Sequence, residues 1–523
     1  MSTLEPPAPP DDDAALEQTA GTKAFRGGLW QSTAQIAPYA YSLVISVVAA
    51  RILGPDQMGR QSYIAFVVVI VQFALSGGLS NALLRYTGDL VGRGRRDMLA
   101  SLANWATPVC VVIGVVGGLG LVIAAALGAA PAWAWIWAAV AVAAGVVGVV
   151  PGAILIGAQQ WRPYANVVLV TGAASVVATV AILEVGGGVS GMLAVIAGTA
   201  IARWLWMEVL SRRVLRSFSS AHEPLGSLRR EVLAFSLAMT VPVALNLVVN
   251  QRSEFFFLEH FSSDKEIALY SIAFQATAAL IAVPRAIGAI LTPSVAGLVG
   301  AGDFDRIQRG FSRVLRLSLL FGLPLTAAGL ALGPDLLHLL YGNRYAGAGT
   351  VLIVVVLTVP LSPLGGASGA LLVGYGRARA PIMISAIAAV VDLTLAWLLV
   401  PRLDAVGAAV ANTAASFVAT TLVLGAAVRV VRGVEIGWGS VIRVTAISTV
   451  AAAAARLVLV GGNGFGLFVL AAAVFVAVLA LGALAVRAVP RDDATFLIHV
   501  AGRRGRFARV LERLSSPSLR PSA

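Results

Sequence analysis

The chain has 523 residues, of which 58% are hydrophobic and only 12% are charged, and its mean hydropathy is +0.87. A soluble domain carries about 25% charged residues, so this composition excludes an ordinary soluble globular protein. Disorder is excluded as well, because disordered chains are poor in apolar residues. The net charge is +13. In a membrane protein, such an excess of Lys and Arg usually sets the orientation of the helices and contacts anionic lipid headgroups. We therefore expect an all-α integral membrane protein whose partners include membrane lipids and no nucleic acid.

The N-terminal segment and the single cysteine narrow the class further. Residues 1–23 contain four prolines and three consecutive aspartates, a pattern that predicts a disordered tail rather than a secretory signal. Cys110 is the only cysteine, which excludes an intramolecular disulfide and a cysteine-only metal cluster.

Apolar runs long enough to cross a bilayer follow along the rest of the chain. A transmembrane helix needs about 20 mostly apolar residues, and about fourteen such runs lie between the glycines, prolines and charges. The predicted spans are 29–50, 61–82, 99–127, 132–156, 164–185, 189–210, 231–253, 267–298, 314–333, 350–373, 381–400, 407–428, 441–461 and 465–486. No connection is longer than about 20 residues, too short for a separately folded catalytic domain, and we expect no enzyme activity.

Alternate connections differ strongly in their content of Lys and Arg. The richer set includes 85–96, 212–230, 306–316 and the segment after Arg487. Short connections rich in Lys and Arg stay in the cytoplasm, so we expect both termini there. The protein is then a multi-pass protein of the cytoplasmic (inner) cell membrane.

Two halves of the chain share short phrases in the same order. Ile64-Ala65-Phe66 matches Ile272-Ala273-Phe274, and Leu155-Ile156-Gly157 corresponds to Leu372-Val373-Gly374. Repeats of this kind are typical of transporters, so we expect two six-helix lobes with a path between them. The predicted organisation is a cytoplasmic tail over 1–23, lobes over 24–230 and 231–432, two additional helices over 433–487 and a basic cytoplasmic tail over 488–523.

Four phrases resemble the polysaccharide-export flippases of the MOP superfamily, in its oligosaccharidyl-lipid branch. They cover residues 50–59 (ARILGPDQMG), 79–86 (LSNALLRY), 339–346 (LLYGNRYA) and 403–412 (LDAVGAAVAN). The resemblance extends from about Lys23 to Arg487 and implies a MATE-like fold. It also implies a substrate, a polyprenyl-pyrophosphate-linked glycan moved across the membrane by alternating access. Polysaccharide polymerase or export machinery would be a further partner.

Arg285 and Arg85 are the first candidates for binding this anionic substrate. Arg285 falls within span eight after Pro284, where a charge is costly unless it faces a cavity or a partner. A guanidinium can hold a pyrophosphate through bidentate contacts. Arg85 ends span two, where a topology signal is its simpler role and a phosphate contact the alternative.

Three further charged residues are candidates for coupling, gating or binding. Asp392, inside span eleven, could bind a coupling cation, H⁺ or Na⁺, or accept a hydrogen bond in the packed lobe. Arg252 and Glu254 end span seven, either as a local ion pair or as a gate. The resembled family commonly has an Asp near this place, where this chain has Glu254.

Polar residues and prolines complete the predicted site. Gln35 and Asn81 could line the path and contact sugar hydroxyls, although interhelical packing is the simpler role. Pro38 and Pro242 occupy similar places in spans one and seven, where proline permits bending. The four histidines show no metal-ligand spacing, and we expect no catalytic residue, metal site or cofactor beyond a coupling ion.

Two other functions fit parts of this pattern. A cation-coupled multidrug exporter of the same fold would need acidic residues in its cavity, whereas most of the charges inside the predicted spans are Arg. A membrane glycan polymerase or ligase would need a large outer loop with paired carboxylates or His. The longest outer connections, 254–266 and 334–349, provide neither.

Overall fold

The computed structural model describes the backbone of residues 12–486 and of residue 493, apart from residues 96, 219–223, 251–252, 289–298, 300–302 and 463. Side chains are described over the same residues except 12–29, 217–218, 246–250 and 282–288. All regular structure in this part of the chain is helical, which confirms the predicted fold class.

Seven helices form the first lobe, the N-lobe. They are α1 (Asp12–Leu53), α2 (Pro55–Gly92), α3 (Asp97–Ala126), α4 (Ala132–Val147), α5 (Val149–Gly157), α6 (Trp161–Glu184) and α7 (Gly188–Phe218). Helix α1 begins within the segment that the sequence assigned to the tail, and α4 and α5 together make one span, Ala132–Gly157. Gly54 separates α1 from α2 with a φ of 79°, a left-handed conformation that glycine adopts without steric cost.

The second lobe, the C-lobe, repeats this plan with more breaks. Its helices are α8 (Leu228–Asn250), α9 (Glu254–Phe261), α10 (Asp264–Gly288), α12 (Phe304–Tyr341), α13 (Gly347–Val355), α14 (Leu361–Gly374) and α15 (Arg379–Val430). A hairpin of α16 (Trp438–Leu459) and α17 (Phe465–Ala485) follows. Helix α15 has a non-helical residue at Asp404 (φ 49°, ψ −129°), so it contains both predicted spans, 381–400 and 407–428.

Eleven helices in the described part of the chain are long and apolar enough to cross a membrane. Since α15 contains two spans, and α8–α9 and α10 occupy the places of spans seven and eight, the structure accommodates all fourteen predicted spans. The end of span seven differs from the prediction, because a further helix, α9, lies beyond residue 253 and reaches Phe261.

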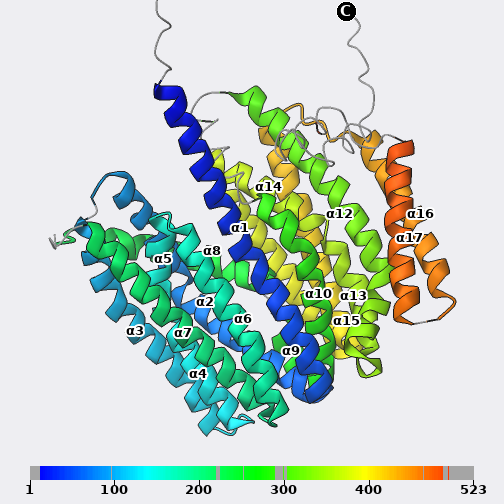
Figure 1. Ribbon diagram of the computed structural model, residues 1–523, viewed down its shortest axis with the longest axis horizontal. Coiled ribbons are helices and arrows are strands. Elements are labelled where there is room, and N and C mark those ends of the chain that lie inside the picture. The colour runs from blue at the N-terminus through cyan, green and yellow to red at the C-terminus, as the bar shows by residue number, and fades with distance from the viewer. Residues whose placement is uncertain are drawn as a thin grey trace, which may run out of the picture.

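The two lobes lie side by side, with α1 running obliquely between them and the α16–α17 hairpin at the far edge of the C-lobe (Figure 1). Helix α1 begins and α17 ends at the same end of the bundle, here called the tail end. The opposite end, where α1 passes into α2, is called the turn end.

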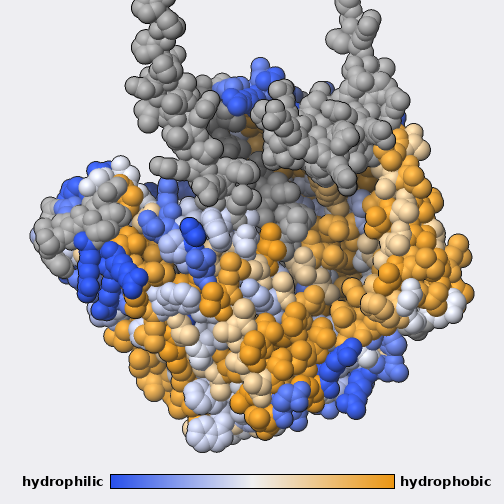
Figure 2. Space-filling model, viewed as in Figure 1, coloured by the Kyte–Doolittle hydropathy of each residue, from blue (hydrophilic) through white to orange (hydrophobic). Residues whose placement is uncertain are grey.

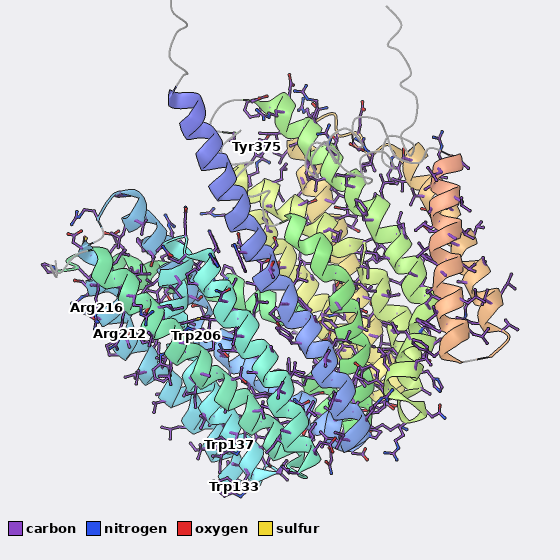
Figure 3. All side chains as sticks on the ribbon, viewed as in Figure 1. Trp133, Trp137, Trp206, Arg212, Arg216 and Tyr375 are labelled. Atoms are coloured by element: carbon purple, nitrogen blue, oxygen red, sulfur yellow. The ribbon has the colours of Figure 1, made fainter. Side chains whose placement is uncertain are left out.

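The surface has the distribution expected of a protein embedded in lipid. Apolar side chains cover most of the visible face between the ends, including α16 and α17, while hydrophilic ones gather towards the ends (Figure 2). Val112 and Val116 on α3 and Leu481 on α17 are more than 60% exposed, which would favour aggregation in water. Trp133 and Trp137 lie near the turn end, and Arg212 and Arg216 lie nearer the tail end (Figure 3), an arrangement typical of the two membrane interfaces.

Candidate functional site

A break between α8 and α9 brings a carboxyl group into the interior of the C-lobe. Helix α8 ends at Asn250 and α9 begins at Glu254, on either side of the polar run in the sequence. Glu254 is completely buried and Ser253 is 5% exposed. The broken helix therefore carries an acidic side chain into the packed lobe instead of into the headgroup region.

Asp392 lies beside Glu254 and is also completely buried. It comes from the first half of α15, and Ser253 Oγ donates a hydrogen bond of 2.9 Å to its Oδ2. The side chain of Asn412, from the second half of α15, lies next to the Glu254 carboxyl group. Three spans thus meet at two carboxyl groups, a hydroxyl and an amide, and we call Ser253, Glu254, Asp392 and Asn412 the acid pair site.

The oxygens of this site have few hydrogen-bond partners. The Asp392 carboxyl group and the Asn412 amide lie within reach of the Glu254 carboxyl group, but neither oxygen of Glu254 nor Oδ1 of Asp392 makes a hydrogen bond of good geometry among the described residues. No ion pair to either carboxyl group is present in the same part of the chain. Buried polar groups are nearly always hydrogen-bonded, and two adjacent carboxylates cannot both remain charged in a dry interior. The arrangement is therefore suited to holding a proton or a small cation.

The sequence named Glu254 and Asp392 separately, and the structure brings them together. Asp392 also accepts a hydrogen bond inside the lobe, from the hydroxyl of Ser253, as in the second role considered for it. Arg252, the predicted ion-pair partner of Glu254, lies outside the described residues. Asn412 appeared in the sequence analysis only as the last residue of the phrase 403–412.

Of the predicted substrate-binding residues, the three whose side chains the structure describes, Gln35, Asn81 and Arg85, are not part of the acid pair site. Arg285 lies on α10, but its side chain is outside the described residues. Gln35 is exposed on α1. Asn81 Nδ2 donates a hydrogen bond of 2.8 Å to the carbonyl of Gly77 on its own helix. The Arg85 guanidinium lies 4.5 Å from the ring centroid of Phe235 on α8, a cation–π contact between the lobes.

Both predicted hinge prolines lie inside helices of the lobe junction. Pro38 is within α1 and Pro242 is within α8. The α2–α8 side of this junction is very closely packed, because a Cβ on Gly78 would lie 2.4 Å from the carbonyl oxygen of Ser236. Small residues permit such an approach between membrane helices.

At the turn end the lobes are joined by an ion-pair cluster that the sequence analysis missed. Arg60 on α2 contacts two acids of the C-lobe, Glu259 on α9 at 2.7 Å and Asp264 on α10 at 3.3 Å. We call these three residues the latch. Opposite charges in two connections on the same predicted side, 51–60 and 254–266, were the signal that could have revealed it.

The end of α1 is bound to the end of α12 close to the latch. The Arg51 guanidinium donates hydrogen bonds to the carbonyls of Leu340, at 2.7 Å, and Leu339, at 2.9 Å. The Tyr345 hydroxyl donates to the carbonyl of Ala50 at 2.9 Å. Tyr345 lies in the connection after α12, where burial raises the pKa of its phenol; a tyrosine hydroxyl is protonated at neutral pH even without this shift, so it can donate. These bonds close the turn end on the α1 side.

Helix α9 links the acid pair site to the latch. Its first residue is Glu254, and Phe255 stacks on Phe66 of α2, with ring centroids 4.8 Å apart. One and a half turns further, Glu259 contacts Arg60. An eight-residue helix therefore touches the acid pair at one end and the opposite lobe along its length.

This fold is found in solved transporter structures. A structure described as lipid II flippase MurJ in an inward closed conformation aligns with 87% of this chain and 97% of its own, with a TM-score of 0.67 at 12% identity. An inward-facing multidrug resistance MATE family transporter of the MOP superfamily aligns over 75% and 94%, with a TM-score of 0.63 at 17% identity. The chain has the MOP transporter fold.

Two further comparisons bear on this fold. The MatE family model matches residues 242–398, which include Pro242 and both carboxyl groups of the acid pair site. A MOP superfamily transporter from Pyrococcus furiosus, described as having a binding pocket of reverse polarity, aligns over 77% of this chain and 95% of its own, with a TM-score of 0.56 at 15% identity. No curated protein matches the sequence.

Proposed function

We propose that the protein is an ion-coupled flippase, which moves a polyprenyl-pyrophosphate-linked oligosaccharide across the cytoplasmic membrane by alternating access of its two lobes. The acid pair site is the observation that carries the coupling. Its two buried carboxyl groups, those of Glu254 and Asp392, have no basic partner in the described part of the chain. Binding or release of H⁺ or Na⁺ there changes the local charge by one unit.

The lobe junction supports the alternating access. Ion binding at Glu254 acts at the start of α9, and the same helix carries Phe255 on Phe66 and Glu259 on Arg60. A ligand shifts a conformational equilibrium only by its differential affinity for the two states. The acid pair site can bind an ion with different affinity in the two states, because α9 contacts both the coupling residues and the opposite lobe.

The lipid-linked substrate is favoured by the extent of the fold. The MurJ structure aligns with more of this chain than the MATE structure does, 87% against 75%. The chain also has the α16–α17 hairpin beyond its two lobes. We place Arg285, Arg85 and Arg252 at the pyrophosphate, with Gln35 and Asn81 near the sugars, and both termini in the cytoplasm. Glycan polymerase or export machinery would take up the product.

A cation-coupled multidrug exporter is the second candidate, because the MatE family model matches residues 242–398. Deletion of the gene separates the two functions. In the flippase, the lipid-linked glycan accumulates on the cytoplasmic face while its synthesis continues. Normal glycan export without a second flippase, together with new sensitivity to cationic drugs, would favour the exporter.

Coupling is tested in proteoliposomes under imposed Na⁺ or pH gradients. In the parent protein, one of the two gradients should accelerate translocation. Glu254→Gln and Asp392→Asn keep the size of each side chain but remove the exchangeable charge, so this acceleration should disappear. Glu208→Gln is the control, because Glu208 pairs with Arg212 on the surface of α7. Retained acceleration in both acid pair variants would contradict the coupling role.

A further inference from the structure

The tail end of α12 binds a carboxylate from beyond the α16–α17 hairpin. Asp493 is completely buried, and its two oxygens accept hydrogen bonds from two arginines of α12. Arg316 donates through both Nε and Nη2, the latter at 2.8 Å, and Arg313 donates through Nε at 3.2 Å. The Arg316 contact is a bidentate fork, the geometry in which a guanidinium binds carboxylates and phosphates alike.

This part of α12 carries more positive charge than one carboxylate balances. Residues 306–316 include four arginines and no acidic residue, and their spacings of three and four residues place the arginines on one face of the helix. The first two, Arg306 and Arg309, are exposed, and no ion pair of either is present among the described residues. The face therefore keeps a positive excess with Asp493 bound, and it attracts further anions.

The chain beside Arg316 indicates the depth of these arginines in the membrane. A Cβ on Gly437 would lie 3.1 Å from the Cδ of Arg316, so the start of α16 passes directly beside this side chain. The next residue, Trp438, is 63% exposed, and exposed indole rings favour the headgroup region of a bilayer. Towards the turn end, apolar side chains cover α16 and α17 (Figure 2). The arginines that bind Asp493 therefore lie at the level of lipid phosphates.

We propose that Arg313 and Arg316 bind the phosphate group of an anionic phospholipid, and that Asp493 fills this site when such a lipid is absent. A guanidinium fork fits phosphate oxygens as it fits carboxylate oxygens. The Arg313 side chain is 30% exposed, which gives a headgroup access to the pair. In the orientation proposed above, this end faces the cytoplasmic leaflet, whose anionic lipids attract basic segments. The site does not depend on the identity of the transported substrate.

The sequence after Asp493 favours the same exchange. Residues 494–523 contain six arginines and one glutamate, and each Lys or Arg near an anionic surface strengthens binding to it. An anionic membrane therefore attracts both the arginines of α12 and the segment that follows Asp493. A zwitterionic membrane has no net charge, so Asp493 stays on α12 there. The ion pair thus responds to the lipid composition of the leaflet.

Lipid binding to the purified full-length protein tests the site. Native mass spectrometry measures the phosphatidylglycerol that the protein retains in competition with phosphatidylcholine. Asp493→Asn keeps the size of the side chain but removes the competing charge, so phosphatidylglycerol retention should rise about 3- to 10-fold. Arg313→Gln combined with Arg316→Gln should lower it below that of the parent. Failure of either change would make the ion pair structural and overturn the proposal.

Two further variants control for indirect effects. Asp493→Glu keeps the competing charge and should retain lipid as the parent does, and a rise equal to that of Asp493→Asn would overturn the competition. Glu208→Gln is the matched control, because it releases Arg212 on the surface of α7, nearer the same end of the bundle (Figure 3). If Glu208→Gln raises retention as much as Asp493→Asn does, any released arginine binds lipid and the proposal fails.

Spin labels follow the position of the segment that carries Asp493. They are placed at Gly310→Cys, where a Cβ would have no atom within 4 Å, and at Thr495→Cys, in a Cys110→Ala background. In phosphatidylcholine nanodiscs, pulsed electron paramagnetic resonance should show a short-distance population. Phosphatidylglycerol should lower the ratio of this population to the rest about 5- to 30-fold, and Asp493→Asn should lack it in both lipids. Equal populations in the two lipids, or a population that persists in Asp493→Asn, would overturn the exchange.

Inorganic pyrophosphate distinguishes a lipid phosphate from a soluble one. Added to the phosphatidylcholine nanodiscs at constant ionic strength, which keeps charge screening equal, it should leave the short-distance population in place. Loss of that population with pyrophosphate but not with phosphatidylglycerol would make this a site for a soluble anion and overturn the lipid assignment.

Discussion

Arg60→Gln should open the turn end of the protein. Arg60 makes two ion pairs between the lobes, and the side chains of Arg60, Glu259 and Asp264 are 29%, 28% and 26% exposed. Exposed pairs contribute about 0.2–1 kcal/mol, and truncation of a buried charged pair costs about 2–5 kcal/mol. Since these side chains are half-buried, we expect Arg60→Gln to destabilise the closed turn end by about 1–2 kcal/mol relative to the open one. Since about 1.4 kcal/mol is a factor of ten, the ratio of closed to open molecules should fall about 5- to 30-fold.

Distance measurements between the lobes report this change. Spin labels at Ser190→Cys on α7 and Lys265→Cys on α10 lie at the turn end on opposite lobes, and replacing buried Cys110 by Ala removes the native thiol. Pulsed electron paramagnetic resonance should show a longer-distance population that is small in the parent and larger in Arg60→Gln. High salt should reduce the difference, because partly exposed charges are screened.

Two variants control for nonspecific effects of losing an arginine. Arg93→Gln removes an ion pair to Asp89 at the C-terminal end of α2, within one lobe, so it should leave the distances unchanged. Arg60→Lys keeps the charge but not the fork that reaches both acids, and should give an intermediate population. If Arg60→Gln has the distance distribution of the parent, the latch does not hold the lobes together.

The remaining predictions concern packing, substrate binding and topology. Gly59→Ala should prevent closure of the turn end, because its Cβ would lie 1.6 Å from a backbone oxygen of α10, and the same distance assay should show the open population. A Cβ on Gly88 would have no atom within 4 Å, so Gly88→Ala should leave the distances unchanged. Arg285→Ala should nearly abolish glycan export at matched membrane levels and Arg285→Lys should reduce it, because Lys lacks the planar fork for phosphate; full export by the alanine variant would make Arg285 structural. Reporter fusions at Ala20 and Ala523 should both report the cytoplasm, and opposite sides would refute the assigned orientation.

Much of the fold was predictable from the order of apolar runs alone. Helices that cross a bilayer satisfy their backbone hydrogen bonds internally. Local composition therefore predicts their number and their approximate ends. Local composition also predicted the break in α15. The residues between the apolar runs 381–400 and 407–428 are more polar, and the non-helical residue Asp404 lies among them. Span seven was the exception, since its continuation through α9 depends on burial of Glu254 in the lobe.

The candidate site was predictable only in part. Glu254 and Asp392 were identified singly, because a carboxyl group inside an apolar run is costly and calls for a function or a partner. That they share one site could not be read from the sequence, because Ser253 and Asp392 are 139 residues apart. The substrate-binding role of Arg285 remains a prediction from the sequence, because its side chain lies outside the described residues.

The sequence by itself determined the membrane helices, the repeated lobes and the individual charged residues that are expensive to bury. Only the tertiary structure decided which of these meet, as Arg60 does with Glu259 across 199 residues. The physical reason is that hydropathy and backbone hydrogen bonding act within a helix. Contacts between lobes depend instead on how closely and at what rotation two helices approach, and at this end a glycine, Gly59, sets that approach against the backbone of α10.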